Sequence, residues 1–239
     1  DVVHDLDLLV GRIIDAVKQK GAWENTVFVF TSDNGGVMTR DTLKAGHRAN
    51  GALQGQKSDI WEGGHRVPFI VRWPGRVTAG SECSHFVCLT DVLATLAEIT
   101  GQSFDPTKSP DSFSIVPLLD GKAPDAARVD RAMILISGGN FPGLGVRHGP
   151  WMFIRGPGPG GVTASGKLKP GGTGYAPYEE AAFTNDSLDT KGQPLPETPT
   201  DQLYNLASDP AQKHNVITAH PEVAKRLSEH LSKQVPEKK

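Results

Sequence analysis

Apolar residues recur along the N-terminal part of the chain at two different spacings. Over residues 2–20 they return every three to four positions with a polar opposite face, and Gly21 follows, which predicts an amphipathic helix. Residues 26–31 are a continuous run rich in β-branched and aromatic side chains, which predicts a strand buried on both faces. A helix followed by such a strand is half of a parallel α/β unit.

The next elements also follow from the pattern. Residues 37–64 are polar and rich in glycine, and we expect a loop over an open end of the sheet. A strand is expected at 67–73, and a helix at 91–100 with Thr90 as its N-cap and Gly101 just after its end.

The character of the chain changes after about residue 131. A strand at 133–136, a hairpin within 146–155, a short strand at 201–206 and a last helix beginning at Pro221 are expected. Between them, residues 156–177 are rich in glycine and proline and predict a mobile surface loop. We therefore expect an α/β domain over residues 1–130 and a small β-plus-helix subdomain over residues 131–239.

Composition excludes some classes of protein. The 239 residues carry a net charge of −2, which argues against a protein that binds nucleic acid mainly by neutralising phosphates. No apolar run approaches the roughly 20 residues that span a bilayer. Cys83 and Cys88 do not have zinc-finger spacing, and they are compatible with a disulfide or with two buried free thiols.

The strongest chemical signal is the sequence S-D-N-G-G at residues 32–36, directly after the first expected strand. Ligands gather at the carboxyl ends of strands in open α/β sheets, and this position offers the Asp33 carboxylate and the Asn34 carboxamide. Both are hard oxygen donors, which suit Ca²⁺ or Mg²⁺ rather than a soft metal. The same residue types also favour an ordinary turn, so the pentapeptide alone predicts either a metal site or a turn.

A second candidate segment, residues 55–69, reads G-Q-K-S-D-I-W-E-G-G-H-R-V-P-F. A lysine beside a metal, such as Lys57, would hold a negatively charged oxygen as a point charge. The ordinary alternative is a solvated surface lysine. Trp61 is expected to pack in the core, and Glu62 is expected to form a structural pair with Arg66.

Taken together, these segments resemble the sulfatase family. S-D-N-G-G is followed in order by G-x-K-x-x-x-W-E-G-G-x-R-V-P-F and by W-P-G at residues 73–75. Residues 7–14 resemble the helix before the S-D-N-G strand of that family, and residues 90–96 resemble its T-D-x-x-x-T-L helix. Residues 203–215 resemble its L-Y-D-L…D-P…E-x-N-L segment. This joint match at ordered positions favours a metal site over a simple turn.

The resemblance implies a fold and a reaction. The fold would be α/β: a portion of an alkaline-phosphatase-like mixed sheet with flanking helices, plus a small C-terminal antiparallel sheet and helix. The reaction would be hydrolysis of sulfate esters, with a sulfated carbohydrate as the expected substrate. In this family a formylglycine, made from Cys or Ser in a C/S-x-P/A-x-R sequence, is the nucleophile, and a Ca²⁺ ion holds the sulfate.

The resemblance also assigns roles to residues of this chain. By position, Asp33 and Asn34 look like two metal ligands, for Ca²⁺ or alternatively Mg²⁺. Lys57 looks like the catalytic lysine that contacts the sulfate and the leaving oxygen. His47 and His65 are candidate substrate-binding residues, for which a structural or solvated histidine is the alternative. The family also favours a periplasmic or extracellular location, which these residues alone leave unknown.

The chain departs from the family because no C/S-x-P/A-x-R sequence occurs in it. Cys83 and Cys88 lack the required arginine and follow the metal motif. We therefore expect the C-terminal portion of a sulfatase that is inactive alone, with the formylglycine on an N-terminal half or a complementary chain as its partner. A sheet cut between strands exposes edges and apolar faces, so the isolated chain should tend to associate.

Two other functions fit parts of this pattern. A phosphodiesterase or phosphonate hydrolase of the same superfamily tends to carry a histidine after the aspartate, which suits Mn²⁺ or Zn²⁺, so Asn34 argues against it. A non-catalytic sulfatase-like subunit would fit the missing nucleophile, whereas Asp33, Asn34 and Lys57 argue for the enzyme.

Overall fold

The structure, a computed structural model, describes residues 2–138, 143–160 and 175–235. The chain forms two compact units. The first unit comprises Asp1–Thr31 and Pro68–Pro124, and the second comprises Ser32–Val67 and Asp125–Lys239. The second unit therefore contains every candidate site residue. Contacts group the candidate loops with the C-terminal part of the chain. The domain boundary at residue 130 that the sequence suggests stays a prediction.

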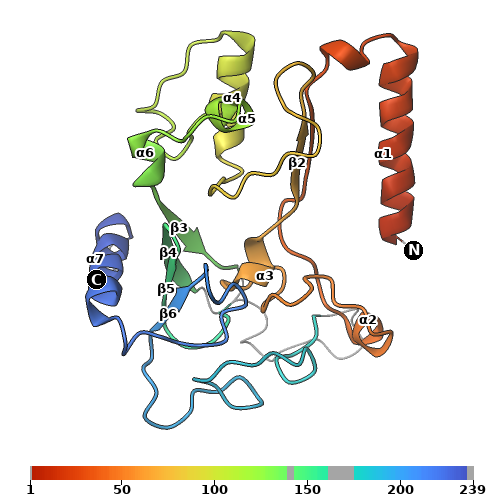
Figure 1. Cartoon of the computed structure of the whole chain (residues 1–239). Helices are drawn as coiled ribbons and strands as arrows, with labels where there is room; N and C mark the ends of the chain where they lie inside the picture. The colour runs from red at the N-terminus through yellow and green to blue at the C-terminus, as the bar shows by residue number, and fades with distance from the viewer. Residues whose placement is uncertain (1, 139–142, 161–174, 236–239) are drawn as a thin grey trace. The chain divides into compact units, whose positions relative to one another are not determined.

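Helices and one short sheet build the first unit (Figure 1). In chain order its elements are helix α1 (Val2–Gln19), the 3₁₀ turn η1 (Trp23–Asn25), strands β1 (Phe28–Thr31) and β2 (Phe69–Arg72), and helices α4 (Asp91–Thr100) and α5 (Val116–Leu119). β1 pairs antiparallel with β2, and alternate β1 residues are exposed. The expectation of a strand buried on both faces in a parallel unit is therefore wrong, because only one face of this two-stranded sheet is covered.

The ends of α4 (Asp91–Thr100) show which capping predictions hold. Gly101 adopts the left-handed conformation at φ 65°, which confirms its predicted place at the helix end. Thr90 lies at the N-cap position, but its side chain makes no capping hydrogen bond. Its hydroxyl donates to the carbonyl of Asp111 at 2.9 Å. The Asp91 carboxylate instead accepts hydrogen bonds from two backbone N–H groups at 3.0 Å. Thr90 therefore occupies the predicted N-cap position without a side-chain cap, and the neighbouring aspartate organises this end of the helix.

A four-stranded antiparallel sheet organises the second unit. Its strands lie in the order β3 (Ala132–Ile136), β4 (Leu144–His148), β5 (Trp151–Arg155) and β6 (Gln202–Asn205), and the last helix is α7 (Pro221–Gln234). His148 pairs with Trp151 across the turn between β4 and β5, which confirms the predicted hairpin. The small C-terminal antiparallel sheet and helix are thus confirmed.

The two faces of this sheet pack against different partners. Phe153 and Leu203 belong to a core cluster with Leu227 of α7, which lies against the sheet in Figure 1. Met152 belongs to a second cluster, which contains Trp61 from the candidate loop region. Because neighbouring strand residues point to opposite faces, α7 covers one face and the loop containing Trp61 covers the other.

The segments expected to be loops contain more structure than the pattern shows. Residues 37–64 include the short helix α2 (Arg40–Lys44) and the beginning of α3 (Glu62–His65), and α6 (Ala126–Val129) precedes β3. In the expected mobile loop, residues 161–174 lie outside the described residues, while residues 158–160 are buried rather than exposed.

Two further predictions concern the cysteines and membranes. Cys83 and Cys88 are both free, Cys83 is exposed and Cys88 is partly exposed, so neither a disulfide nor a pair of buried thiols is present. Among the helices that the structure describes, none combines the length and hydrophobicity needed to cross a bilayer.

Candidate functional site

Backbone hydrogen bonds hold the two candidate segments side by side. The Gly35 N–H donates to the carbonyl of Gly64 at 2.9 Å, and the Lys57 N–H donates to the carbonyl of Gly36 at 3.2 Å. Asp33 and Asn34 lie directly before these glycines. The structure therefore brings the backbones of the S-D-N-G-G loop and the lysine segment into direct contact.

Glycines make this close approach possible. A Cβ atom on Gly35 would lie 1.8 Å from the carbonyl oxygen of Gly63, and one on Gly63 would lie 2.2 Å from that of Gly55. Gly55 also has a φ of +86°, which other residues rarely adopt. The glycines shared with the family pattern are thus required by packing between the two segments.

The polar groups at this junction are available for a ligand. The Asn34 amide nitrogen donates to the carbonyl of Gly35 at 3.0 Å, and its side-chain oxygen has no hydrogen-bond partner among the residues that the structure describes. Asp33 is exposed and Lys57 is half-buried, and neither side chain has a hydrogen-bond or ion-pair partner within the described ranges. Two free oxygen donors and a free ammonium fit the donor chemistry expected for a Ca²⁺ and sulfate site.

The junction supplies only part of a metal shell. Ca²⁺ takes about six to eight oxygen ligands. Across residues 2–138, 143–160 and 175–235, no group of three or more His, Cys, Asp and Glu side chains is placed to hold a metal. Asp33 and Asn34 would therefore be two of several ligands, and their metal role stays a prediction.

The backbone around Lys57 is held by its neighbours. The Gln56 side-chain oxygen accepts from the Met38 N–H at 3.0 Å, and its nitrogen donates to the carbonyl of Ala176 at 2.8 Å. The Gln56 N–H donates to the Asp59 carboxylate at 2.9 Å. These bonds hold Gln56, directly before Lys57, and connect it to Asp59, which follows the lysine. The Lys57 side chain takes part in none of these bonds.

A buried charge cluster follows the lysine. Arg66 donates to the Glu62 carboxylate at 2.6 Å through Nε, which confirms the predicted pair, and Arg147 lies 3.6 Å away from the same oxygen. Burial lowers the pKa of Arg147, which the nearby Glu62 partly offsets. Trp61 is fully buried and confirms its predicted core position.

The two candidate histidines lie in different environments. His47 is exposed, just after α2. His65 is half-buried, and its Nε2 lies 3.0 Å from the carbonyl of Ile60. Burial lowers the pKa of His65, which favours a neutral ring. Neither placement tests contact with a substrate, so both roles stay predictions.

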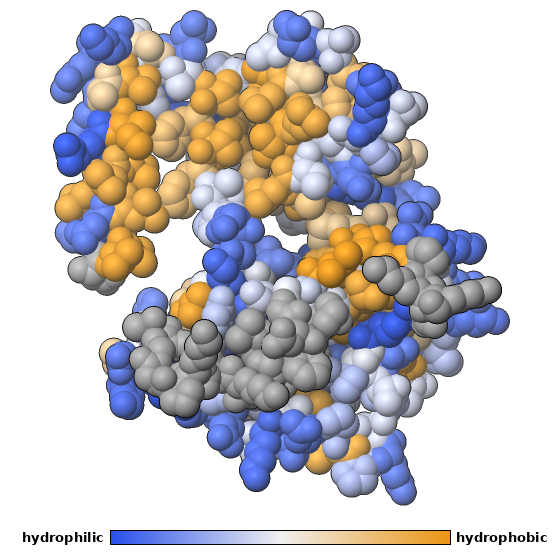
Figure 2. Space-filling model, turned by 180° about the vertical axis from the view of Figure 1, so that it is seen from behind, coloured by the Kyte–Doolittle hydropathy of each residue, from blue (hydrophilic) through white to orange (hydrophobic). Residues whose placement is uncertain are grey.

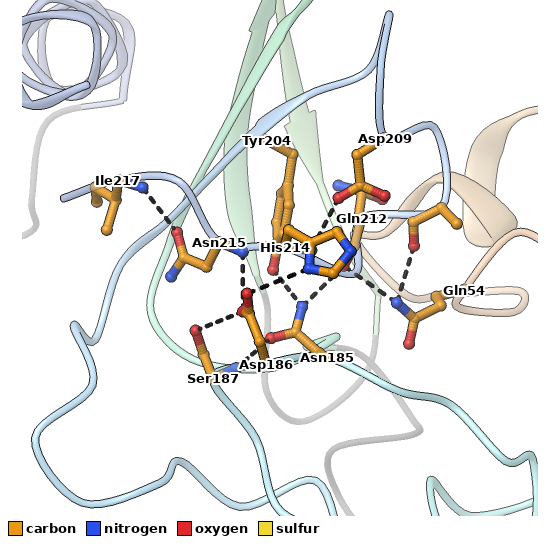
Figure 3. A network of polar contacts seen from close by, with 11 residues as sticks. Gln54, Asn185, Asp186, Ser187, Tyr204, Asp209, Gln212, His214, Asn215 and Ile217 are labelled. Carbon is orange, nitrogen blue, oxygen red and sulfur yellow. Dashed lines mark hydrogen bonds and ion pairs between the residues drawn. The ribbon is translucent and has the colours of Figure 1, made fainter. Parts of the chain in front are cut away.

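Sequence reasoning missed a network of buried amides that anchors the candidate segment to the C-terminal part (Figure 3). Gln54 donates to the carbonyls of Ala211 and Gln212 at 2.9 and 3.1 Å. The Glu62 N–H donates to the Gln212 side chain at 2.6 Å. Asn185 donates to the carbonyl of Gln212 at 2.8 Å. The L-Y-N-L resemblance pointed to this part of the chain, but not to these bonds.

Comparison with known proteins identifies relatives of the chain. The family model for Sulfatase matches residues 1–102. An N-acetylgalactosamine-6-O-sulfatase of Bacteroides thetaiotaomicron is 31% identical over 237 residues, which cover 97% of this chain and 40% of that protein. Arylsulfatase D of Homo sapiens is 37% identical over 123 residues, which cover 51% of this chain and 21% of that protein. The chain thus spans at most about two fifths of these relatives.

Solved structures share its architecture. BT33336S-sulf, from work on the metabolism of multiple glycosaminoglycans by Bacteroides thetaiotaomicron, aligns with a TM-score of 0.67 at 26% identity over 96% of this chain and 42% of that one. Ps i-CgsB in complex with k-i-k-neocarrahexaose aligns with a TM-score of 0.68 at 22% identity over 97% of this chain and 41% of that one. With these likenesses to sulfatases in sequence and in structure, the chain belongs to the sulfatase family and has the alkaline-phosphatase-like fold.

Proposed function

We propose that this chain supplies the metal-binding and sulfate-binding part of a sulfuric ester hydrolase. The observation that carries the proposal is the junction at which the backbones of Gly36 and Lys57 are hydrogen-bonded. Asp33 and Asn34 present free oxygen atoms beside this junction, and Lys57 presents a free ammonium among the described residues. A sulfatase relative that aligns with 97% of the chain supports the same reaction.

Each side chain has a distinct task in this proposal. Asp33 and Asn34 would hold Ca²⁺, or alternatively Mg²⁺, which when bound supplies positive charge beside the ester. The Lys57 ammonium holds a sulfate oxygen and stabilises negative charge on the leaving oxygen. His47 and His65 would contact the remainder of the substrate. The neutral ring favoured for His65 suits hydrogen bonding rather than charge pairing.

The relatives support a proposal for the substrate class. An N-acetylgalactosamine-6-O-sulfatase and a protein from work on glycosaminoglycan metabolism both point to sulfated carbohydrates. We propose the same class here. A phosphonate hydrolase is not favoured, because the curated relatives named above are sulfatases and Asn34 stands where that class tends to carry histidine.

We further propose that additional sulfatase sequence completes the site, because the formylglycine motif is absent from these 239 residues. The first unit supports this with a large apolar surface. None of the 18 residues of α1 is buried, and Ile70 and Leu93 are also exposed. Figure 2 shows apolar side chains, in orange, gathered on the face of the first unit turned toward the viewer. Such a surface is typical of an interaction site.

The proposal is tested by comparing this chain alone with the complete product of the gene that encodes it. We expect the complete product to hydrolyse N-acetylgalactosamine 6-sulfate or an aryl sulfate, and to lose this activity when EDTA removes the metal. The chain alone should be inactive. Hydrolysis by the chain alone would contradict its predicted dependence on additional sequence. A preference for the matching phosphate ester would contradict the sulfatase assignment.

Replacing Lys57 tests the site itself. Lys57→Met should lower kcat by about 10²- to 10³-fold, as expected when one group that stabilises the developing charge is removed. Lys225→Met, at an exposed position of α7, is the matched control and should leave kcat unchanged. Equal activity of the two variants would remove Lys57 from the catalytic site.

A further inference from the structure

Asn50 connects the two halves of the proposed site through a single side chain. Its Oδ1 accepts the Gly36 N–H at 2.7 Å, and its Nδ2 donates to the carbonyl of Gly36 at 3.0 Å. The same Nδ2 donates to the carbonyl of Gly55 at 3.0 Å. Gly36 lies two residues after Asn34, and Gly55 lies two residues before Lys57. Asn50 therefore binds each segment two residues away from a proposed functional residue, Asn34 in one segment and Lys57 in the other.

A carboxamide suits this position better than other side chains. It has one acceptor oxygen and two N–H donors, and Asn50 uses them to bind both backbone groups of Gly36 and one of Gly55. Asn50 lies close to the Gly36 backbone: a Cβ atom on Gly36 would be 3.0 Å from the Asn50 side-chain oxygen. An aspartate would have the same shape, but it would direct an oxygen at two carbonyl groups. Neither serine nor alanine would reach both segments.

We propose that Asn50 is a positioning residue, which sets the distance between the Asp33–Asn34 pair and the Lys57 ammonium without contacting metal or substrate. This inference rests on the proposed function, since it names the residue that assembles the same site. A metal and an ammonium that bind one sulfate ester must be held at a fixed separation, and small displacements at such sites are costly to the rate. Side chains that orient metal ligands typically contribute about 10- to 100-fold to metal affinity or activity.

The test compares Asn50→Asp with Asn215→Asp in the complete gene product. Asn215 is a matched control because its carboxamide also makes three hydrogen bonds to the backbone, accepting from Leu203 and Ile217 and donating to Asp201. It makes these bonds beside β6, and none of them reaches the lysine segment. The measurements are kcat, the Ca²⁺ concentration for half-maximal activity, the unfolding midpoint, and amide hydrogen exchange over residues 32–37 and 55–58.

Asn50→Asp should raise the half-activating Ca²⁺ concentration and lower kcat, with a combined loss of about 10- to 100-fold. Hydrogen exchange should increase in both segments together. Asn215→Asp should lower the unfolding midpoint without moving the Ca²⁺ dependence. The proposal is overturned if the two variants have the same Ca²⁺ dependence and kcat, or if exchange increases in only one segment. An unsubstituted protein without sulfatase activity contradicts the proposed function, and the exchange measurement then still decides whether Asn50 couples the segments.

Discussion

Replacing Glu62 by glutamine tests the buried charge cluster beside the proposed site. The Glu62 side chain is 1% exposed, and its carboxylate lies 2.6 Å from Arg66 Nε and 3.6 Å from Arg147 Nη1. Glu62→Gln keeps the shape of the side chain and removes its charge. Two guanidinium groups then lose their interaction with the Glu62 carboxylate, and the Arg147 side chain is only 18% exposed. The substitution should therefore destabilise the second unit.

The size of this effect follows from the burial of each partner. Removing one member of a buried ion pair costs about 3–5 kcal/mol. Arg66 is 44% exposed, so water screens its part of the interaction to about 1 kcal/mol or less. Arg147 is the more buried partner, and we expect a total loss near the lower limit, about 3 kcal/mol. For a domain of this size, about 2–4 °C in Tm correspond to each kcal/mol, so Tm should fall by about 6–12 °C.

Urea unfolding followed by tryptophan fluorescence measures this loss, because Trp61 is fully buried next to Glu62. Glu180→Gln is the matched control. Glu180 also pairs with an arginine, Arg40, through two hydrogen bonds at 2.5 and 2.7 Å, but the two side chains are 35% and 58% exposed. The control should cost much less than Glu62→Gln, because water screens an exposed ion pair. Equal losses of unfolding free energy in the two variants would refute the argument that the buried Glu62 cluster stabilises the fold more than the exposed Arg40–Glu180 pair does.

Three further substitutions test the packing around the site. Gly35→Ala places a methyl group 1.8 Å from the carbonyl oxygen of Gly63. It should lower the free energy of unfolding by more than about 1–3 kcal/mol, measured by thermal unfolding. An unchanged Tm would contradict the close approach of these two segments. Burial lowers the pKa of His65, so the unfolded state binds a proton at this histidine more strongly than the folded state does. The free energy of unfolding should therefore decrease as the pH drops below the ordinary His pKa of 6.5. His65→Gln should make the free energy of unfolding less dependent on pH, as measured by urea titrations at several pH values. Tyr204→Phe removes a hydroxyl that donates to Gln202 at 2.6 Å and should cost about 1–2 kcal/mol in the same titration, whereas no loss would show that the buried amides find other partners.

Elements with a strong local pattern could be predicted from the sequence. Helices α1, α4 and α7 follow from apolar residues at helical spacing, and Gly101 follows from the need for a left-handed residue at a helix end. The hairpin between β4 and β5 follows from its Gly-Pro turn. In each case the information lies within a few residues of the element, so a single sequence contains it.

Pairing and burial depend on distant residues and were harder to predict. The apolar run over residues 26–31 predicted a strand, but β1 pairs antiparallel with β2 some 40 residues later and exposes alternate side chains. The polar sequence over residues 37–64 predicted a loop. The structure of this segment is stabilised by side-chain amides that bond to distant backbone, and a local pattern does not show such bonds. Burial of Gln54 and Gln212 has no local signal, since glutamine is usually exposed.

The candidate site was predicted as a list of residue types, whereas its assembly came only from the structure. Asp33, Asn34 and Lys57 were found because hard donors and a lysine occur at spacings shared with a family. Nothing in that pattern indicated that the backbones of Gly36 and Lys57 would be joined directly. Their metal, catalytic and substrate roles, like those of the two histidines, stay predictions until the substitutions are made.

Side-chain amides contribute many of the bonds that hold the proposed site, and within the described ranges the Asp33 and Lys57 side chains have no partner. Asn50 binds the backbone of Gly36 and Gly55, and the Gln56 side chain binds the backbone of Met38 and Ala176. Gln54 binds the C-terminal part. A carboxamide satisfies N–H and C=O groups at once and adds no net charge. A carboxylate or an ammonium in the same positions would add a charge to the segments that present Asp33 and Lys57 and would change the electrostatics of the proposed site. Positioning by amides therefore keeps the fixed geometry of the loops separate from the electrostatics on which the proposed chemistry depends.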